Sequence, residues 1–208
     1  MAKKKANGNT AAGAGEQTAA KHRALQDDID AKDAAKPKSA AKKEKPPVQA
    51  GERKQPTRLP AQHLEKPGNE HELDLAPRFL APDYVGSGKL EGMAAIVTGG
   101  DSGIGRAVAV LFAREGADVA IVYLSEHEDA KETQRWVEKE GTCCLLIPGD
   151  VKSVGFCERA VEKTVKKFGR LDILVNNAAF QLHSASLEEL SEEHLQETLQ
   201  TNIGGYFH

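Results

Sequence analysis

Aromatic residues are scarce in this chain of 208 residues and are missing from its beginning. Phe, Tyr and Trp make up 5% of the sequence, and the first of them is Phe79. A segment without such side chains is not expected to build a hydrophobic core of its own. We therefore expect folded structure only in the later part of the chain, which is long enough for about one domain.

Long apolar runs are also lacking. No stretch of about 18 apolar residues is present that could cross a bilayer, and the lysines at positions 3–5 are not followed by the apolar segment of a secretory signal. Neither a membrane-spanning nor a secreted protein is therefore expected, and a cytoplasmic location is the simplest prediction.

Patterns of metal ligands are equally sparse. The three cysteines, Cys143, Cys144 and Cys157, form no Cys-x-x-Cys pair, and none of the seven histidines is spaced as a metal ligand from a cysteine or another histidine. Small buried thiols in a reducing compartment explain the cysteines better than metal or redox chemistry does. We predict no metal site.

The charges are nearly balanced, with a formal net charge of −3, but they are unevenly distributed. Residues 1–58 hold 14 Lys and Arg against 7 Asp and Glu, whereas residues 59–208 hold 14 against 24. The first segment is rich in Ala, Lys and Pro, which is typical of a disordered tail that is extended or transiently helical. Such a tail either keeps the protein in solution or makes a weak polyanion contact through counterion release.

Apolar residues return between residues 59 and 90, yet four prolines interrupt this segment. Proline removes a backbone donor and clashes with the preceding helical turn, so no long helix can form here. The mixture of apolar residues and prolines favours an extended arm that lies on a folded surface, either its own or that of a neighbour.

Short apolar runs alternate with amphipathic segments after Gly92. Short runs indicate strands, and apolar residues repeated every three or four positions indicate helices. Strands are expected at residues 94–97, 118–123, 143–147 and 171–175, and helices at residues 103–115, 126–140, 153–169 and from 191 onward. In the last helix the residues expected to face inward are Leu195, Leu199, Ile203 and Tyr206. This alternation predicts an α/β fold with a doubly wound parallel sheet of strand order 3-2-1-4.

A glycine-rich loop joins the first strand to the first helix of this domain, with the sequence Thr98-Gly99-Gly100-Asp101-Ser102-Gly103-Ile104-Gly105. Glycines allow the backbone to approach a pyrophosphate closely, and the N-terminus of the following helix directs N–H groups and positive charge toward it. Because a strand precedes the loop and a helix follows it, the loop predicts a dinucleotide-binding site.

The loop pattern Thr-Gly-x-x-x-Gly-Ile-Gly resembles the fingerprint of the short-chain dehydrogenase/reductase family. Two further segments resemble motifs of that family in the same order, Asp150-Val151 and Asn176-Asn177-Ala178-Ala179, and Asn202 lies where the family has a helix asparagine. The segment that leads into the loop is similar to the N-terminally extended, glucose-dehydrogenase-like branch. This resemblance covers residues 60–208 and implies a Rossmann-type domain over residues 91–208.

The resemblance implies a role for each matched residue. Asp150 and Val151 would contact the adenine ring, and Asn202 would support catalysis. The cofactor-binding residues that it implies are Thr98, Gly99, Asp101, Ser102, Gly103, Ile104, Gly105, Tyr123, Asp150, Val151, Asn177, Ala178 and Ala179. The residues by themselves also allow Asp150 to be a helix cap and Asn177 to belong to an ordinary turn. Ala179 replaces a family glycine, which is a mild change if its φ is negative.

The choice between NAD and NADP is left open by the end of the second strand. An acidic residue there usually holds the ribose 2′-hydroxyl of NAD, and residues 118–123 end without one, which permits NADP. The charges of Asp101, Glu126 and Glu128 would repel a 2′-phosphate, unless Arg106 or a lysine offsets them. The predicted cofactor is therefore NAD or NADP.

Catalysis in the family uses a tyrosine with a lysine four residues later. A phenol of pKa about 10 exchanges protons near neutrality only when a nearby cation stabilises its phenolate. None of the three tyrosines, Tyr84, Tyr123 and Tyr206, is followed by such a lysine within the chain. The chain therefore resembles the front part of a dehydrogenase, truncated before the catalytic tyrosine, and we expect no turnover from it alone.

The resemblance implies that the complete protein is an NAD(P)-dependent oxidoreductase for a small alcohol, aldehyde or sugar, and a homo-oligomer, usually a tetramer. The residues themselves leave a different class of function open, namely a non-catalytic protein that binds dinucleotides or polyanions with help from the basic tail. A redox-silent stress or scaffold protein is a third alternative, which the charged tail supports only weakly.

Overall fold

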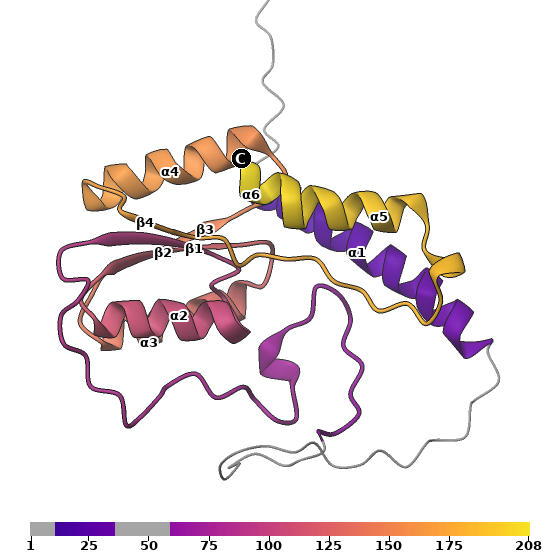
Figure 1. Cartoon of the computed structure of the whole chain (residues 1–208), viewed down its shortest axis with the longest axis horizontal. Helices are drawn as coiled ribbons and strands as arrows, with labels where there is room; N and C mark the ends of the chain where they lie inside the picture. The colour runs from indigo at the N-terminus through magenta and orange to yellow at the C-terminus, as the bar shows by residue number, and fades with distance from the viewer. Residues whose placement is uncertain (1–10, 36–58) are drawn as a thin grey trace, which may run out of the picture.

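Four parallel strands form the sheet at the centre of the molecule. The computed structural model describes residues 11–35 and 59–208 (Figure 1). The strands are β1 (Ala94–Thr98), β2 (Asp118–Tyr123), β3 (Cys144–Pro148) and β4 (Ile173–Val175). Their order across the sheet is β3-β2-β1-β4, and every neighbouring pair is parallel. The predicted fold class and strand order are thus confirmed.

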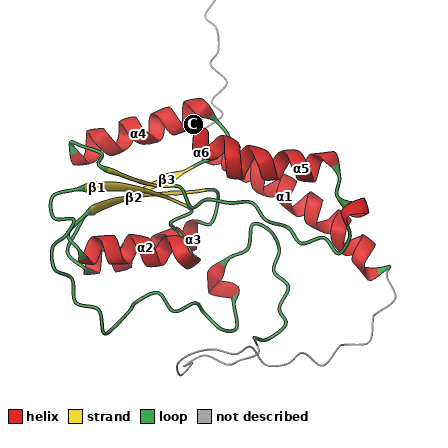
Figure 2. Ribbon diagram, viewed as in Figure 1, coloured by secondary structure: helices red, strands yellow, loops and turns green. Residues whose placement is uncertain are grey.

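Helices cover both faces of the sheet, with α2 and α3 on one face and α4 on the other (Figure 2). Their bounds, with that of the helix after β4, are α2 (Gly103–Arg114), α3 (His127–Lys139), α4 (Val154–Phe168) and α5 (Glu192–Leu199). Ser153 caps α4 by accepting a hydrogen bond from the amide of Phe156, and Gly169 ends it with a φ of 81°. None of the helices in the described residues has the length and hydropathy that a bilayer span requires.

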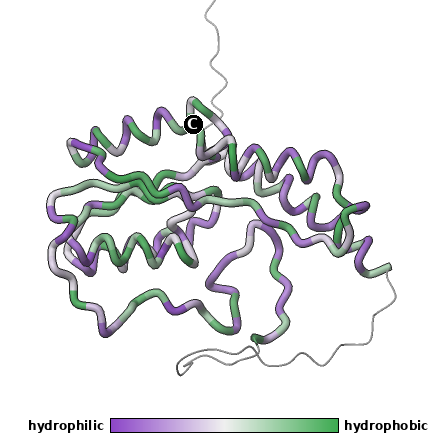
Figure 3. Tube along the Cα trace, in the orientation of Figure 1, coloured by the Kyte–Doolittle hydropathy of each residue, from purple (hydrophilic) through white to green (hydrophobic). Residues whose placement is uncertain are grey.

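Successive strand residues point to opposite faces of the sheet and so divide the core in two. Ile121 packs with residues of α2 and α3, while Ile96 and Ile147 pack with Phe156 of α4. Because helices cover both faces, the strands are almost continuously apolar (Figure 3). This packing holds the carboxyl ends of the strands together at one edge, where the predicted motif residues lie.

The helix after β4 turns a different side toward the protein from the one that the sequence predicted. The four apolar residues expected to face inward are exposed, namely Leu195, Leu199, Ile203 and Tyr206. Its buried side chains include His194 and Glu197 instead. The reason is that Phe180 and His22 lie on that side, the first against the His194 ring and the second paired with Glu197.

A helix, α1 (Ala11–Ala34), forms part of the segment that the sequence predicted to be a disordered tail. Its alanines have high helix propensity, and Thr18, His22 and Gln26 attach one side of it to the domain and the arm beside α5 (Figure 1). The prediction missed a docked helix because the buried side of α1 is no apolar stripe: it mixes the polar Thr18, His22 and Gln26 with Ala19 and Ile29. The rest of that segment, residues 1–10 and 36–58, lies outside the described residues.

The arm, residues 59–90, runs along α2 and α3 with no strand or α-helix of its own (Figure 1). It contains one 3-10 turn, η1 (Glu70–Glu72). Two buried carboxylates attach it to the domain. Glu115, after α2, accepts hydrogen bonds from two arm amides, and Glu70 of the arm pairs with Arg106 of α2. The arm therefore lies on the surface of its own domain.

Candidate functional site

A cleft of about 340 Å³ opens at the carboxyl ends of the strands, the edge at which open α/β sheets bind ligands. Four segments form what we call the domain wall, namely the glycine loop (residues 98–105), the end of β2 with the residues after it (122–126), residues 149–151 and residues 177–181. A further part of the lining, which we call the N-terminal wall, consists of Thr18 and His22 of α1 with residues 66–68 of the arm. Nearly every predicted cofactor-binding residue lies in or beside the domain wall.

The glycine loop follows a backbone path that side chains would block. Gly99 and Gly103 have positive φ angles of 62° and 49°, and a Cβ atom on Gly105 would lie 1.9 Å from the carbonyl oxygen of Gly99. The start of α2 therefore lies directly against the end of β1, and the first backbone amides of a helix have no helical acceptors. Such a cradle fits a pyrophosphate at a helix N-terminus.

Thr98 and Asn177 join the glycine loop to the end of β4. The hydroxyl oxygen of Thr98 accepts hydrogen bonds from the backbone amides of Asn177 (2.9 Å) and Ala178 (3.0 Å). The side-chain amide of Asn177 donates to the carbonyl oxygens of Thr98 and Gly99, both at 3.0 Å. Asn177 thus supports the glycine loop directly and is more than an ordinary turn residue.

Ala178 and Ala179 line the cleft beside Asn177. The effect of the missing family glycine depends on the backbone angle at this position. Among the described residues other than glycine, positive φ occurs at Ala81 and not at Ala179. The methyl group of Ala179 therefore adds no backbone strain.

Asp150 follows β3 and lines the cleft. One carboxylate oxygen accepts a hydrogen bond from the amide of Lys152 (2.9 Å), and the other accepts one from the hydroxyl of Thr18 in α1. Since Ser153 caps α4, Asp150 is not the cap of that helix. Val151 is buried in the core on the α4 side and also lines the cleft. The carboxylate expected beside adenine thus has a partner from the N-terminal wall.

Acidic residues gather where the glycine loop meets the end of β2. Asp101 is 6% exposed, and burial, reinforced by the charges of Glu126 and Asp129, raises its pKa to about 7. Arg106, considered from the sequence as an offset for these charges, is itself buried and binds Glu70 and the carbonyl oxygen of Asp101. Its guanidinium is therefore committed to the arm and the loop backbone rather than to a 2′-phosphate.

Two other predicted residues make hydrogen bonds within the protein. The hydroxyl of Tyr123 lies 3.0 Å from Nδ1 of His127, and burial raises the tyrosine's pKa. Asn202 lies in a π-helical turn (Gln200–Gly204) after α5. Its side-chain oxygen accepts from the amide of Phe180 (2.7 Å), and its side-chain nitrogen donates to the carbonyl oxygen of Phe180 (2.9 Å). Asn202 is thus oriented by a residue that lines the cleft.

A comparison with known protein families agrees with the dinucleotide-binding geometry of the glycine loop. A family model described as short chain dehydrogenase matches residues 93–208, which include the whole sheet and its helices. The chain belongs to this family.

Relatives of this short-chain dehydrogenase chain cover much of its length. The uncharacterized oxidoreductase YhdF of Bacillus subtilis is 55% identical over 148 residues, which are 71% of this chain and 51% of that protein. NADPH-dependent aldehyde reductase 1, chloroplastic, of Arabidopsis thaliana is 44% identical over 152 residues, which are 70% of this chain and 52% of that protein. The chain spans about half the length of these curated relatives.

Solved structures of short-chain dehydrogenases share the fold. A short chain dehydrogenase from Mycobacterium paratuberculosis bound to NAD has a TM-score of 0.55 and 30% sequence identity to this chain. The match covers 57% of this chain and 48% of that one. The likeness therefore extends to a protein with a nicotinamide cofactor in place.

The N-terminal wall consists of cleft residues that the sequence did not predict, and Phe180 and Gln181 of the domain wall were not predicted either. Thr18 and His22 come from α1, and the His22 ring packs on Phe180 with the ring centroids 4.3 Å apart. Lys66 of the arm donates a hydrogen bond to the carbonyl oxygen of Gln181 (3.0 Å), and burial lowers its pKa. No motif marks these residues. What pointed toward them in the sequence was the expectation that the arm lies on a folded surface.

Proposed function

We propose that this chain forms the dinucleotide-binding part of an NAD(P)-dependent oxidoreductase that acts on a small alcohol, aldehyde or sugar. The single observation that best supports this is the glycine loop, in which Gly99, Gly103 and Gly105 let the backbone follow a path closed to other residues. NAD and NADP both remain in the proposal, because one relative is named for NADPH and one similar structure contains NAD.

Each part of the domain wall would have its own task in holding the dinucleotide. The amides of α2 that follow Gly103 would bind the pyrophosphate, since the Gly103 amide itself donates to Glu70. Residues 150–151 would lie beside the adenine ring, and residues 177–179 beside the nicotinamide ribose. The nicotinamide supplies the hydride chemistry when it is bound. Asn202 is the proposed catalytic residue of this chain, and its hydrogen bonds with Phe180 fix the orientation of its side-chain amide.

We further propose that these 208 residues bind the cofactor without completing the reaction. Tyr84 lies on the arm and bonds to Glu115, Tyr123 pairs with His127, and no tyrosine in the chain has a lysine four residues later. We therefore assign the general acid of the reaction to neither Tyr84 nor Tyr123. A tetrameric assembly, a cytoplasmic location and a polyanion contact by the basic N-terminal residues stay predictions from the sequence.

Titration of the chain with NADH and NADPH tests the proposal. The nicotinamide fluorescence of at least one nucleotide should change on binding, and Gly105→Val, whose side chain would collide with Gly99, should weaken binding by at least about tenfold. Gly155→Ala is the matched control, because a Cβ there meets the flexible side chain of Arg159 at 3.3 Å. Circular dichroism verifies that each variant is folded. The proposal fails if the folded wild-type chain binds neither nucleotide or if Gly105→Val binds as tightly.

A further inference from the structure

The arm places a carboxylate at the start of the helix that follows the glycine loop. Glu70 of η1 is 7% exposed, and its Oε2 accepts a hydrogen bond from the backbone amide of Gly103 at 2.5 Å. The unpaired amides and the dipole of a helix stabilise a negative group at its N-terminus. The arm therefore contacts the loop at the glycine whose positive φ begins α2.

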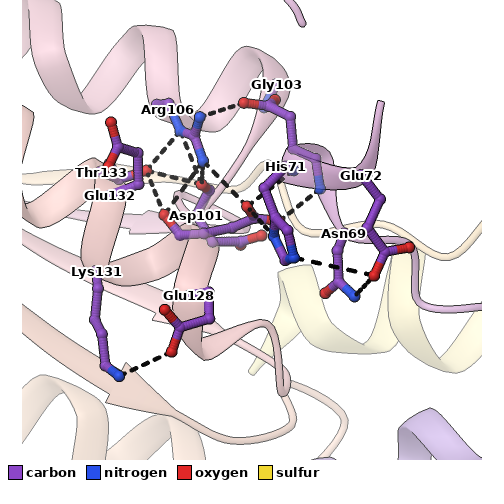
Figure 4. Close-up of polar contacts among 12 residues, drawn as sticks. Asn69, His71, Glu72, Asp101, Gly103, Arg106, Glu128, Lys131, Glu132 and Thr133 are labelled. Carbon is purple, nitrogen blue, oxygen red and sulfur yellow. Dashed lines mark hydrogen bonds and ion pairs between the residues drawn. The ribbon is translucent and has the colours of Figure 1, made fainter. Parts of the chain in front are cut away.

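The other carboxylate oxygen of Glu70 pairs with the guanidinium of Arg106. Arg106 in turn donates to the carbonyl oxygen of Asp101 through Nε (3.0 Å) and Nη2 (2.8 Å), and to the hydroxyl of Thr133 (2.8 Å). Figure 4 shows Arg106 among Gly103, Asp101 and Thr133, with these contacts dashed. One carboxylate thus acts on the loop at two points, directly at Gly103 and through Arg106 at Asp101.

The contacts of Glu70 and Arg106 depend on one another because both side chains are buried beside Asp129. Asp129 of α3 accepts hydrogen bonds from the backbone amides of Glu70 (2.6 Å) and His71 (3.2 Å) and lies 3.7 Å from the guanidinium of Arg106. Arg106 is a permanent cation between two carboxylates, and a buried charge that loses a partner is strongly destabilised. Removing the charge of Glu70 would therefore favour a different arrangement of Arg106 and of the loop that it holds.

We propose that Glu70 is a positioning residue that holds the glycine loop in its dinucleotide-binding conformation. The proposal rests on the proposed function of the loop and adds a requirement to it, namely that the arm be docked. Glycine makes the loop conformation accessible but does not select it, because glycine populates many conformations. The contacts of Glu70 with Gly103 and, through Arg106, with Asp101 supply that selection.

Nucleotide binding and amide hydrogen exchange of Glu70→Gln in the 208-residue chain test this proposal. Gln has nearly the shape of Glu but lacks the charge that pairs with Arg106 and is stabilised at the helix N-terminus. We expect about tenfold weaker binding of NADH and NADPH and faster amide exchange in residues 99–106. Equal or tighter binding, or unchanged exchange in the loop, would overturn the proposal.

Glu115→Gln is the matched control. Glu115 is also a buried carboxylate, 5% exposed, and it anchors the arm at the other end of α2 through the amides of Ser87 (3.0 Å) and Lys89 (2.9 Å). If Glu70 only attached the arm, both variants would lower the unfolding temperature and leave the dissociation constants unchanged. A role in positioning the loop instead predicts that Glu70→Gln alone changes the dissociation constants.

A second variant, Glu70→Asp, covers the case in which Glu70→Gln does not fold. Asp keeps the charge but is one methylene shorter, so it cannot reach both Gly103 and Arg106. Binding about threefold weaker than that of the wild type supports the proposal, and unchanged binding overturns it. If the wild-type chain binds neither nucleotide, the proposed function fails, and loop exchange in the two Glu70 variants alone decides whether Glu70 holds the loop.

Discussion

The two walls of the cleft are held by different interactions. The domain wall is supported by the apolar core of the sheet, in which residues such as Ile121 are fully buried. The N-terminal wall is attached to the domain by polar pairs, among them Thr18 with Asp150 and His22 with Glu197. Apolar burial does not depend on pH, but a polar pair depends on the charge of each partner. A single polar substitution should therefore loosen the N-terminal wall and leave the domain folded.

The arm supplies residues 66–68 of the N-terminal wall and also contacts the domain wall. Gln26 of α1 donates to the carbonyl oxygen of Leu64 (2.9 Å) and accepts from the amide of Lys66 (2.7 Å), while Glu70 contacts the glycine loop. The family model matches residues 93–208 and so begins after the arm. The glycine loop thus has contacts with a segment outside the residues that the family model matches.

The largest effect is expected at Asp101 in the domain wall. It tests whether the stability of this wall changes with pH, although its apolar core does not. Burial, with the charges of Glu126 and Asp129, raises the pKa of Asp101 from 3.8 to about 7. The unfolded chain therefore loses this proton first, and the stability that the protonated carboxyl contributes is lost as pH rises from about 4 to 7. Asp101→Asn should raise the free energy of unfolding by up to about 4 kcal/mol at pH 8 and by much less at pH 4. Urea denaturation across this pH range measures the difference.

An exposed carboxyl provides the control for this prediction. Glu128 lies on α3 and its hydrogen bond with Lys131 lowers its pKa, so Glu128→Gln should give no gain at pH 8. Identical unfolding curves for Asp101→Asn and the wild type at pH 8 would contradict the prediction and leave the domain wall without a pH-sensitive element at this position.

The next effect concerns the link between the glycine loop and β4. Asn177→Ala removes the donor to the carbonyl oxygens of Thr98 and Gly99. We expect a loss of about 2 kcal/mol in the free energy of unfolding and dinucleotide binding weaker by about tenfold, measured by urea denaturation and titration. The neighbouring Asn176→Ala, at an exposed position, should change neither. Normal nucleotide binding by Asn177→Ala would show that the loop holds its shape without this side chain.

The smallest effect on the domain is expected from the N-terminal wall. Burial alone would raise the pKa of Glu197, but hydrogen bonds with His22 and Lys152 lower it to about 2. The contact with His22 of α1 stabilises the docked helix above about pH 4.5 and is lost as pH falls toward 2. Glu197→Gln should weaken the docking of α1 at pH 7 by about 1–2 kcal/mol. Faster amide exchange within residues 11–34 would show it, with an almost unchanged unfolding midpoint.

Glu193→Gln is the matched control for that experiment, because Glu193 is exposed on α5, the helix that also carries Glu197. It should leave exchange in residues 11–34 as in the wild type. A large fall in the unfolding midpoint of Glu197→Gln would show that the two walls unfold together. It would contradict the prediction that the N-terminal wall can loosen while the domain stays folded.

Much of the domain wall was predictable because its causes are local in the sequence. Short apolar runs alternating with amphipathic segments predicted the order β3-β2-β1-β4, and glycines between a strand and a helix predicted the loop at residues 98–105. The N-terminal wall was not predictable in this way. Thr18 of this wall and Glu70 of the arm lie in segments without periodic apolar residues, and each acts through polar contacts with residues far along the chain.

The sequence by itself therefore determined the strand order, the glycine loop and the positions of Asn177 and Asp150, since periodicity and glycine content constrain the backbone wherever the chain folds. Only the tertiary structure decided what surrounds them. It showed which side of α5 is buried, that Arg106 is bound to Glu70, and that α1 lies against the cleft. Polar pairing between distant segments depends on which groups burial brings together, and no local pattern encodes that outcome.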